Sequence, residues 1–273
     1  MLRKTALISA ICVGLSAVAI STSAFAADKI HWRLQSNLNA GEPGFVAVQE
    51  KFAKLATEMS GGRITFEVFP VGALFPVKDG LEAVASGVTE MALLTGGYYA
   101  GKIGPFANLE SGVPGSLHSA TERYAFFYKK GFIDLAREAY GKHGVYYLGP
   151  QLSSGWDIMS KKPLTSMADF KGLKIRVQAS RVLVRQMQEM GSAPSVTPLI
   201  DVYQALKDGR LDGHENTPSN IYSQRLHEGQ SHLTVSNHGY LAYAVIVNKA
   251  FWDKLPAGIR TTLEGAMRDA TTA

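Results

Sequence analysis

Two segments of the chain match each other without gaps, and this internal similarity constrains the fold more than any other feature. The segments are Asp79–Glu90 and Asp201–Asp212. Each reads as a short helix, a glycine that ends it, and an acidic residue that leads into a strand or loop. Repeated units indicate two similar α/β lobes, although such units also recur within single α/β domains. Two lobes imply a cleft, since ligands of open α/β sheets bind beyond the carboxyl ends of the strands.

The rest of the chain alternates between strand and helix patterns. Residues 45–59 place apolar side chains at helical spacing, and residues 64–69 alternate as a strand does. Further helices are predicted over 79–85, 120–140, 182–190, 202–207 and 257–270, and further strands over 30–35, 91–95, 145–148, 158–160, 174–177, 233–235 and 242–248. This order is typical of an α/β protein with largely parallel sheets. We therefore predict a two-lobed α/β fold.

The first 26 residues have the pattern of a secretory signal peptide. Arg3 and Lys4 precede an uncharged apolar run over residues 6–20, and Ala24 and Ala26 are the small residues that signal peptidase requires. The run is short for a membrane span, and no later stretch is apolar for long enough to cross a bilayer. We expect cleavage after Ala26 and a periplasmic mature protein with no membrane span of its own.

Charge is concentrated in one part of the chain. Overall, 28 Lys and Arg oppose 23 Asp and Glu, a net charge of +5, and residues 161–185 contain seven basic residues but only one acid, Asp169. Nucleic-acid binding typically uses a broad basic stripe with exposed aromatic residues, and exported proteins rarely meet nucleic acid. We expect an anion site for a small ligand here, with most of these basic residues forming a solvated surface.

Motifs of common catalytic, nucleotide-binding and redox sites are absent. The nearest approach to a zinc motif is His227 and His232, whose five-residue spacing would turn them to different sides of a helix. The single cysteine, Cys12, would leave with the signal peptide. We therefore predict neither an enzyme nor a protein with a cofactor or structural metal.

Arg176 is the strongest candidate for anion binding. In the sequence Leu173-Lys-Ile-Arg-Val177, the apolar residues share one face of a strand by period two, and Arg176 points the other way near the strand end. Its guanidinium offers a planar fork that matches a carboxylate with two charge-assisted hydrogen bonds.

The chain resembles the solute receptors of TRAP transporters, which are secondary importers of organic acids. The resemblance rests on Asp169–Val177 (DFKGLKIRV) and Val202–Asn216 (VYQALKDGRLDGHEN), followed in order by Tyr222, Asn237-His238 and Phe251-Trp252, and it covers nearly the whole mature chain. It implies a two-lobed periplasmic receptor, without catalysis, that closes on an organic carboxylate and delivers it to a membrane permease. The implied boundaries are a signal peptide over 1–26, a first lobe over 27–153 to which 242–273 returns, and a second lobe over 154–241.

The resemblance also implies ligand contacts. Arg176 would clamp the carboxylate with help from Asn216, while Trp156 stands where many members carry a second arginine. That departure favours a monocarboxylate, with aromatic, hydroxy and keto acids among the candidates. Aromatic and hydroxyl contacts would come from the end of the strand over 91–95, namely Thr95, Tyr98 and Tyr99. One of the two tyrosines would face away from the cleft if the backbone there is extended, and a core position for Trp156 is the alternative to a ligand contact.

Several alternatives stay open at this point. Gln151 and Glu215 lie near the positions that hold a cation in keto-acid-binding members. An exported lyase or isomerase on a similar fold, and a receptor feeding a sensor kinase, are alternative functions. Family members usually continue past the helix over 257–270 through a long helix that bridges both lobes, whereas this chain stops at Ala273.

Overall fold

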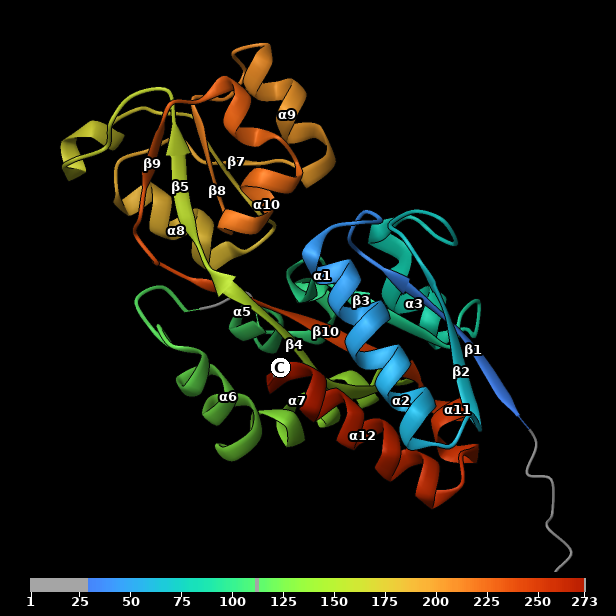
Figure 1. The fold of residues 1–273 in the computed structure, drawn as a ribbon. Coiled ribbons are helices and arrows are strands. Elements are labelled where there is room, and N and C mark those ends of the chain that lie inside the picture. The colour runs from blue at the N-terminus through green and yellow to red at the C-terminus, as the bar shows by residue number, and fades with distance from the viewer. Residues whose placement is uncertain (1–28, 111–112, 273) are drawn as a thin grey trace, which may run out of the picture.

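The computed structural model describes residues 29–110 and 113–272, which form two five-stranded sheets joined by two chain crossings (Figure 1). The predicted signal peptide over 1–26 lies outside the described residues. Within the described part of the chain, no helix is both long and apolar enough to cross a membrane.

The first sheet has the strand order β2-β1-β3-β10-β4. Its strands are β1 (Ile30–Ser36), β2 (Ile64–Phe69), β3 (Met91–Leu94), β4 (Val145–Gly155) and β10 (Tyr240–Asn248). β1 pairs in parallel with β2 and β3, whereas β10 runs antiparallel to β3 and β4. We call this sheet and the helices around it the first lobe.

The second sheet has the order β7-β6-β8-β5-β9. Its strands are β5 (Asp157–Ser160), β6 (Ile175–Val177), β7 (Ser195–Val196), β8 (Gly213–Asn216) and β9 (His232–Thr234). β6 is parallel to β7 and β8, and β5 is antiparallel to β8 and β9. This sheet and its helices are the second lobe. Both sheets are thus mixed, so the expectation of largely parallel sheets was wrong.

The two sheets have equivalent topology, as the internal similarity predicts. In each sheet, the second strand in the order, β1 or β6, pairs in parallel with both of its neighbours. The next strand is antiparallel to these three and belongs to a crossing between the lobes: β10 in the first sheet and β5 in the second. The matched segments form α3 (Gly80–Ala85) and α9 (Leu199–Lys207). Each helix is followed by a glycine with positive φ, Gly87 at 83° and Gly209 at 71°, a conformation that favours glycine.

The remaining helices cover the sheets. They are α1 (Pro43–Val46), α2 (Lys54–Met59), α4 (Ala100–Ile103), α5 (Phe106–Glu110), α6 (Ala120–Lys129), α7 (Phe132–Gly141), α8 (Arg181–Glu189), α10 (Pro218–Ser223), α11 (Lys249–Lys254) and α12 (Ala257–Thr272). A π-helical stretch, Ala47–Ala53, joins α1 to α2. The single helix predicted over 120–140 is two helices, because Gly131 has a φ of 82° that ends one before the next begins.

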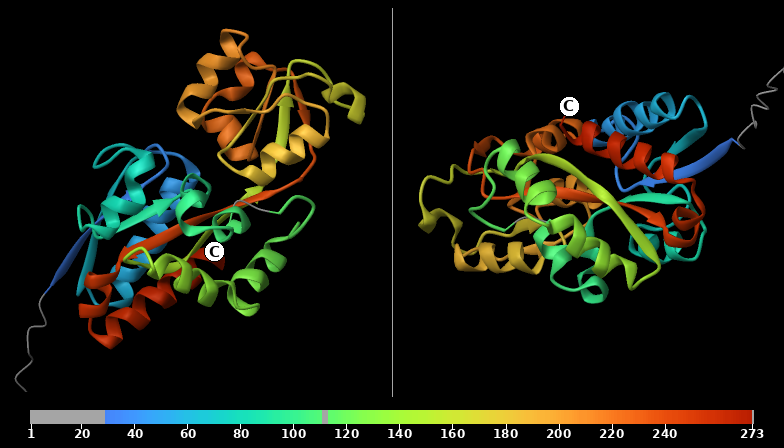
Figure 2. Two further views of the ribbon diagram at one scale, coloured as in Figure 1. Left: turned by 180° about the vertical axis from the view of Figure 1, so that it is seen from behind. Right: turned by 90° about the horizontal axis from the view of Figure 1, so that it is seen from below.

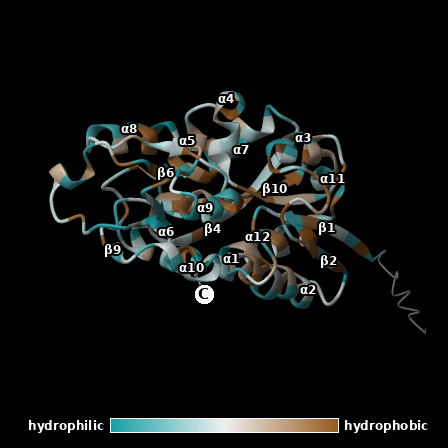
Figure 3. Cartoon of the chain, turned by 90° about the horizontal axis from the view of Figure 1, so that it is seen from above, coloured by the Kyte–Doolittle hydropathy of each residue, from teal (hydrophilic) through white to brown (hydrophobic). Residues whose placement is uncertain are grey.

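Apolar side chains concentrate inside each lobe. Every residue of β10 is buried, and the strand is brown along much of its length where it passes through the first lobe (Figure 3). α12 packs against β4 and against α2 on the same lobe. One cluster of buried apolar residues continues from the first lobe through Trp156 into the second lobe, so apolar packing also joins the two lobes.

Two adjacent strand segments connect the lobes (Figure 2). β4 continues into β5 on the way out, and the chain returns from β9 to β10. The segments are hydrogen-bonded to each other where they cross, from Trp156 N to the Gly239 carbonyl at 3.0 Å and from His238 N to the Trp156 carbonyl at 3.2 Å. Trp156 therefore lies at the junction of the two lobes.

Candidate functional site

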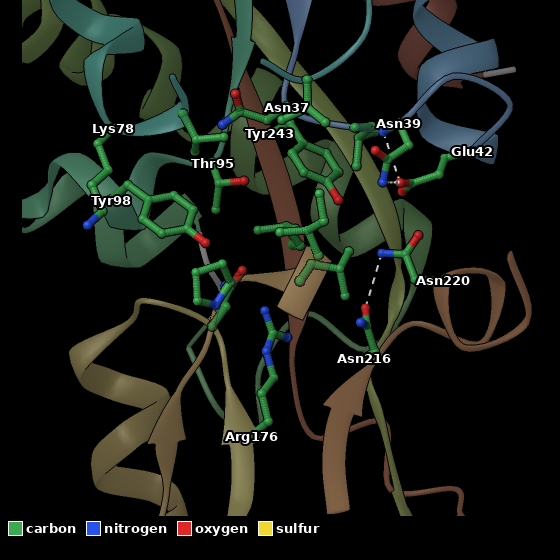
Figure 4. A pocket seen from close by; sticks show the side chains of 18 of the residues that line it. Asn37, Asn39, Glu42, Lys78, Thr95, Tyr98, Arg176, Asn216, Asn220 and Tyr243 are labelled. Carbon is green, nitrogen blue, oxygen red and sulfur yellow. Dashed lines mark hydrogen bonds between the residues drawn. The ribbon is translucent and has the colours of Figure 1, made fainter. Parts of the chain in front are cut away.

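A cavity of about 150 Å³ lies between the lobes (Figure 4). Most of its lining residues lie at or just after the ends of β1, β2, β3, β6, β7 and β8, so the carboxyl ends of strands from both sheets meet there, as expected for open α/β sheets. The others come from β10 and from Trp156 at the crossing. Its polar and charged lining residues are Asn37, Asn39, Glu42, Lys78, Thr95, Tyr98, Arg176, Gln178, Asn216, Asn220 and Tyr243. Its apolar lining residues are Leu38, Val71, Val77, Trp156, Pro198, Leu199, Ile200 and Leu241.

Arg176 enters this cavity from β6 and is only 5% exposed. Its Nε donates to the Thr197 carbonyl at 2.9 Å and its Nη1 to the Glu215 carbonyl at 3.5 Å. None of the ion pairs among the described residues includes Arg176. Burial lowers the pKa of its guanidinium, and the negative charge of Glu215 opposes that shift. The site therefore holds a buried cation whose direct hydrogen bonds go to neutral carbonyls.

The histidine beside Arg176 adds no positive charge. His214 is fully buried in β8. Burial, and then the charge of Arg176, lower the pKa of His214 to about 3. The imidazole is thus neutral at ordinary pH, which leaves the guanidinium as the cation at this wall of the cavity.

Asn216 is the last residue of β8, two positions after His214, and it lines the same cavity. Its Oδ1 accepts from Thr217 N at 2.9 Å and from Asn220 Nδ2 at 3.1 Å. With its oxygen engaged, Asn216 presents its amide nitrogen on the side of Arg176 (Figure 4). Guanidinium and amide N–H groups side by side suit an anionic oxygen.

The first lobe contributes Thr95 and Tyr98 to the opposite wall. Thr95 follows β3, and Tyr98 lies in a 3₁₀ turn, Gly96–Tyr99. Burial raises the pKa of Tyr98, and the charge of Arg176 across the cleft opposes that shift. The phenol is therefore a hydrogen-bond donor that points into the cavity beside Arg176 (Figure 4).

Trp156 contributes to the cavity and to the packing of the junction. It is 2% exposed and lies among buried apolar residues of both lobes. Its Nε1 has no hydrogen-bond partner among the described residues. An indole that lines a cavity with its N–H unpaired offers a donor as well as apolar surface.

Three predicted site residues do not line this cavity. Tyr99 turns away into the core of the first lobe, where its hydroxyl donates to the Val77 carbonyl. Glu215 accepts from Gln178 N at 3.1 Å and pairs with His238 Nε2 at 3.1 Å. Gln151 donates to the Gly44 carbonyl at 2.9 Å and borders a neighbouring hollow instead.

The structure gives no cation site to Gln151 and Glu215. Their side chains contact different groups, because each is held by hydrogen bonds within its own surroundings. Across residues 29–110 and 113–272, no group of acidic, histidine or cysteine side chains is arranged to hold a metal ion.

Sequence reasoning missed several polar lining residues, among them Asn37, Asn39, Glu42 and Lys78. The first three lie in the loop after β1, and Lys78 lies in a short 3₁₀ helix, Val77–Asp79, after β2. The signal available was their position, since the ends of parallel strands gather at one edge of a sheet. Their side-chain types alone are those of ordinary surface loops.

A buried carboxyl supports the turn that carries Tyr98. Glu110 is fully buried, and Tyr140 donates to its Oε2 at 2.8 Å. A Cβ at Gly96 would lie 2.0 Å from that oxygen, so the carboxyl packs directly against the backbone of the turn. Burial raises the pKa of Glu110 to about 8. The group is therefore mostly protonated at neutral pH.

Comparisons with known proteins agree with this geometry. Residues 34–273 match the family model described as bacterial extracellular solute-binding protein, family 7. The C4-dicarboxylate-binding periplasmic protein DctP of Rhodobacter capsulatus is 41% identical over 232 residues, which are 81% of this chain and 66% of that protein. The C4-dicarboxylate-binding protein DctB of Bacillus subtilis is 31% identical over 231 residues, which are 81% of this chain and 63% of that protein. The chain thus spans about two thirds of the length of these relatives.

A solved structure shows the same architecture. A TRAP periplasmic solute binding protein from Pseudomonas aeruginosa, with bound L-malate, matches with a TM-score of 0.80 at 26% identity, covering 89% of this chain and 83% of that one. This similarity confirms the predicted two-lobed α/β fold. All three proteins are described as binding proteins and none as an enzyme, in agreement with the prediction made from the missing catalytic motifs.

Proposed function

Since this chain belongs to the family 7 bacterial extracellular solute-binding proteins, we propose that it is a periplasmic receptor for an organic carboxylate, which it delivers to a TRAP-type membrane permease. The proposed moving units are the lobes over 27–153 with 242–273 and over 154–241. The crossing at Trp156 and Gly239 would act as the hinge between them.

The burial of Arg176 at the cavity wall is the observation that supports this proposal most strongly. A buried guanidinium whose direct partners are two carbonyl oxygens lies at the wall of a cavity between two lobes. Burying a charge without a directly paired counter-ion is costly, and a ligand carboxylate would supply that direct partner. Closure of the lobes would exclude water and so strengthen the pairing.

Asn216 and Tyr98 would complete the carboxylate site from both lobes. Asn216 lies beside Arg176 in the second lobe, and Tyr98 approaches from the first. A ligand that contacts donors on both lobes favours the closed form over the open one, because only the closed form makes all the contacts. This is the state in which a receptor would present its cargo to a permease.

The favoured ligand is a monocarboxylate with an apolar remainder. By the resemblance to TRAP solute receptors, Trp156 stands where many members carry a second arginine. Much of the cavity wall is apolar, including Leu38, Val77 and Leu241. Burial of such a remainder would contribute about 25 cal/mol per Å² of apolar surface removed from water.

A second candidate, a C4-dicarboxylate, is favoured by Lys78. This exposed lysine also borders the cavity, on the first lobe, and its flexible ammonium would suit a second carboxylate group. The names of the Rhodobacter and Bacillus relatives point to the same class.

Thermal-shift screening of the mature chain against a library of mono- and dicarboxylates tests the proposal, because a ligand of the native state raises the melting temperature. We expect at least one acid to do so. Lys78→Ala should weaken binding of a dicarboxylate about tenfold and leave a monocarboxylate unchanged. Failure of every acid to shift the melting temperature would refute the receptor, and turnover of a bound acid would indicate the lyase or isomerase alternative.

A further inference from the structure

Glu42 is a buried acid in the wall of the cavity, and it is only 2% exposed. Its Oε1 accepts from Asn39 N at 2.9 Å, from Asn39 Nδ2 at 2.6 Å and from Gln224 Nε2 at 2.7 Å. Its Oε2 is buried and has no hydrogen-bond partner among the described residues. One oxygen of this carboxylate is therefore saturated with donors and the other has none.

The contact with Gln224 accounts for Oε1 alone. Glu42 precedes α1 in the first lobe and Gln224 directly follows α10 in the second, so this bond bridges the cleft. The bond to Gln224 explains why Oε1 is buried between the lobes. It does not explain why Oε2 is buried without a partner, because burying such an oxygen costs free energy unless another group donates a hydrogen bond to it.

Glu42 is one of the residues that line the cavity, so a ligand that fills the cavity lies against this side chain. Glu42 lies beside Asn39 on one wall, and Arg176 rises from another (Figure 4). An acid whose carboxylate is held by Arg176 would extend its remainder away from the guanidinium, toward the walls formed by the first lobe. A donor on that remainder would satisfy the unpartnered oxygen and form a hydrogen bond to a charged acceptor, which is among the stronger kinds.

We propose that Glu42 determines specificity by accepting a hydrogen bond from a donor group on the bound acid, a hydroxyl or an amine. The protein would then select substituted acids over analogues that lack the donor. This inference rests on the proposed function, since it places the ligand carboxylate on Arg176.

Two series of acids that differ at one carbon test the inference by calorimetry. They are propionate, lactate and alanine, and succinate, malate and aspartate. We expect lactate or alanine to bind about tenfold more tightly than propionate, or malate or aspartate about tenfold more tightly than succinate. The hydroxy and amino members separate the two kinds of donor.

Glu42→Gln is the decisive variant because it keeps the shape and the Oε1 contacts but replaces the unpartnered acceptor with an amide N–H. It should remove the preference, bringing each substituted acid to within about threefold of its parent. Gln224→Ala is the matched control, since it removes only the bond to Oε1, and it should keep the preference. If Glu42→Gln does not fold, Glu42→Asp, which retains the charge but shortens its reach, replaces it.

The outcomes separate this inference from the function on which it rests. Equal affinity for substituted and parent acids in the wild type, or an undiminished preference in Glu42→Gln, would overturn the role of Glu42. Loss of the preference in Gln224→Ala as well would assign it to the contact between lobes instead. Binding of any of these acids that survives Arg176→Ala would overturn the carboxylate site itself.

Discussion

The buried carboxyl of Glu110 predicts a specific pH dependence of stability. Its pKa is raised from 4.5 to about 8 by burial in the folded protein, whereas an unfolded chain titrates near the ordinary value. The folded state therefore keeps a proton that the unfolded state releases. The stability associated with this proton is fully present below the unfolded pKa and is lost as pH rises toward the folded pKa.

The size of the effect follows from the shift. Each pH unit inside this window costs at most about 1.4 kcal/mol, so the wild type should lose about 3 kcal/mol of unfolding free energy between roughly pH 5 and pH 8 through this group. Glu110→Gln imitates the protonated carboxyl and still accepts from Tyr140, so it should not suffer this loss. At about pH 5 the two proteins should agree within about 1 kcal/mol, and at about pH 8 the variant should be the more stable by several kcal/mol.

Urea unfolding at a series of pH values measures this difference directly. All other titrating groups are shared, so the difference between the two proteins reports Glu110 alone. Parallel stability curves for the wild type and Glu110→Gln would refute the reasoning, because they would mean that the carboxyl titrates alike in the folded and unfolded states.

Two further predictions concern packing and binding. A Cβ at Gly213 would lie 2.6 Å from the backbone carbonyl oxygen of Met159 in the paired strand, so Gly213→Ala should destabilise the protein by about 1–3 kcal/mol in urea unfolding. Its control, Gly101→Ala in α4, has open space around the new Cβ and should be neutral or stabilising by about 0.5–1 kcal/mol; equal losses would contradict the steric account. A bound acid should change the emission of Trp156, the tryptophan that lines the cavity, so Trp156→Phe should abolish the ligand-dependent fluorescence change, and an undiminished change would place the ligand elsewhere.

Periodicity predicted the elements well wherever local chemistry decides them. The glycine-terminated units at Gly87 and Gly209 formed as expected, because backbone conformation is a local property. The amphipathic pattern over 45–59 is helical throughout, but residues 47–53 are π-helical rather than α-helical. The prediction of a single helix over 120–140 was wrong at Gly131, where a positive φ interrupts an otherwise continuous pattern. The mixed pairing of the sheets arises because β5 and β10, which follow the crossings, pair with strands that are distant in the sequence. Local patterns do not encode such pairings.

The candidate site was partly accessible from the sequence. Arg176 stood out as a cation on the polar face of an apolar strand, and its neighbours Asn216, Trp156, Thr95 and Tyr98 also line the cavity. Glu42 did not stand out, because a charged residue in a loop looks solvated until the other lobe covers it, here through Gln224. Lys78 did not stand out because it is an exposed lysine like many others. Whether Gln151 lines the cavity depends on the direction of one side chain of a long strand, and here that side chain bonds to the Gly44 carbonyl.

Calorimetry on Arg176 variants tests the central claim most directly, with the acid that most raises the melting temperature as the titrant. Arg176→Ala should weaken binding about a hundredfold or more, since it leaves a buried carboxylate without its partner. Arg176→Lys should fall in between, because it keeps the charge but loses the planar fork. Wild-type affinity in a folded Arg176→Ala protein would contradict the account.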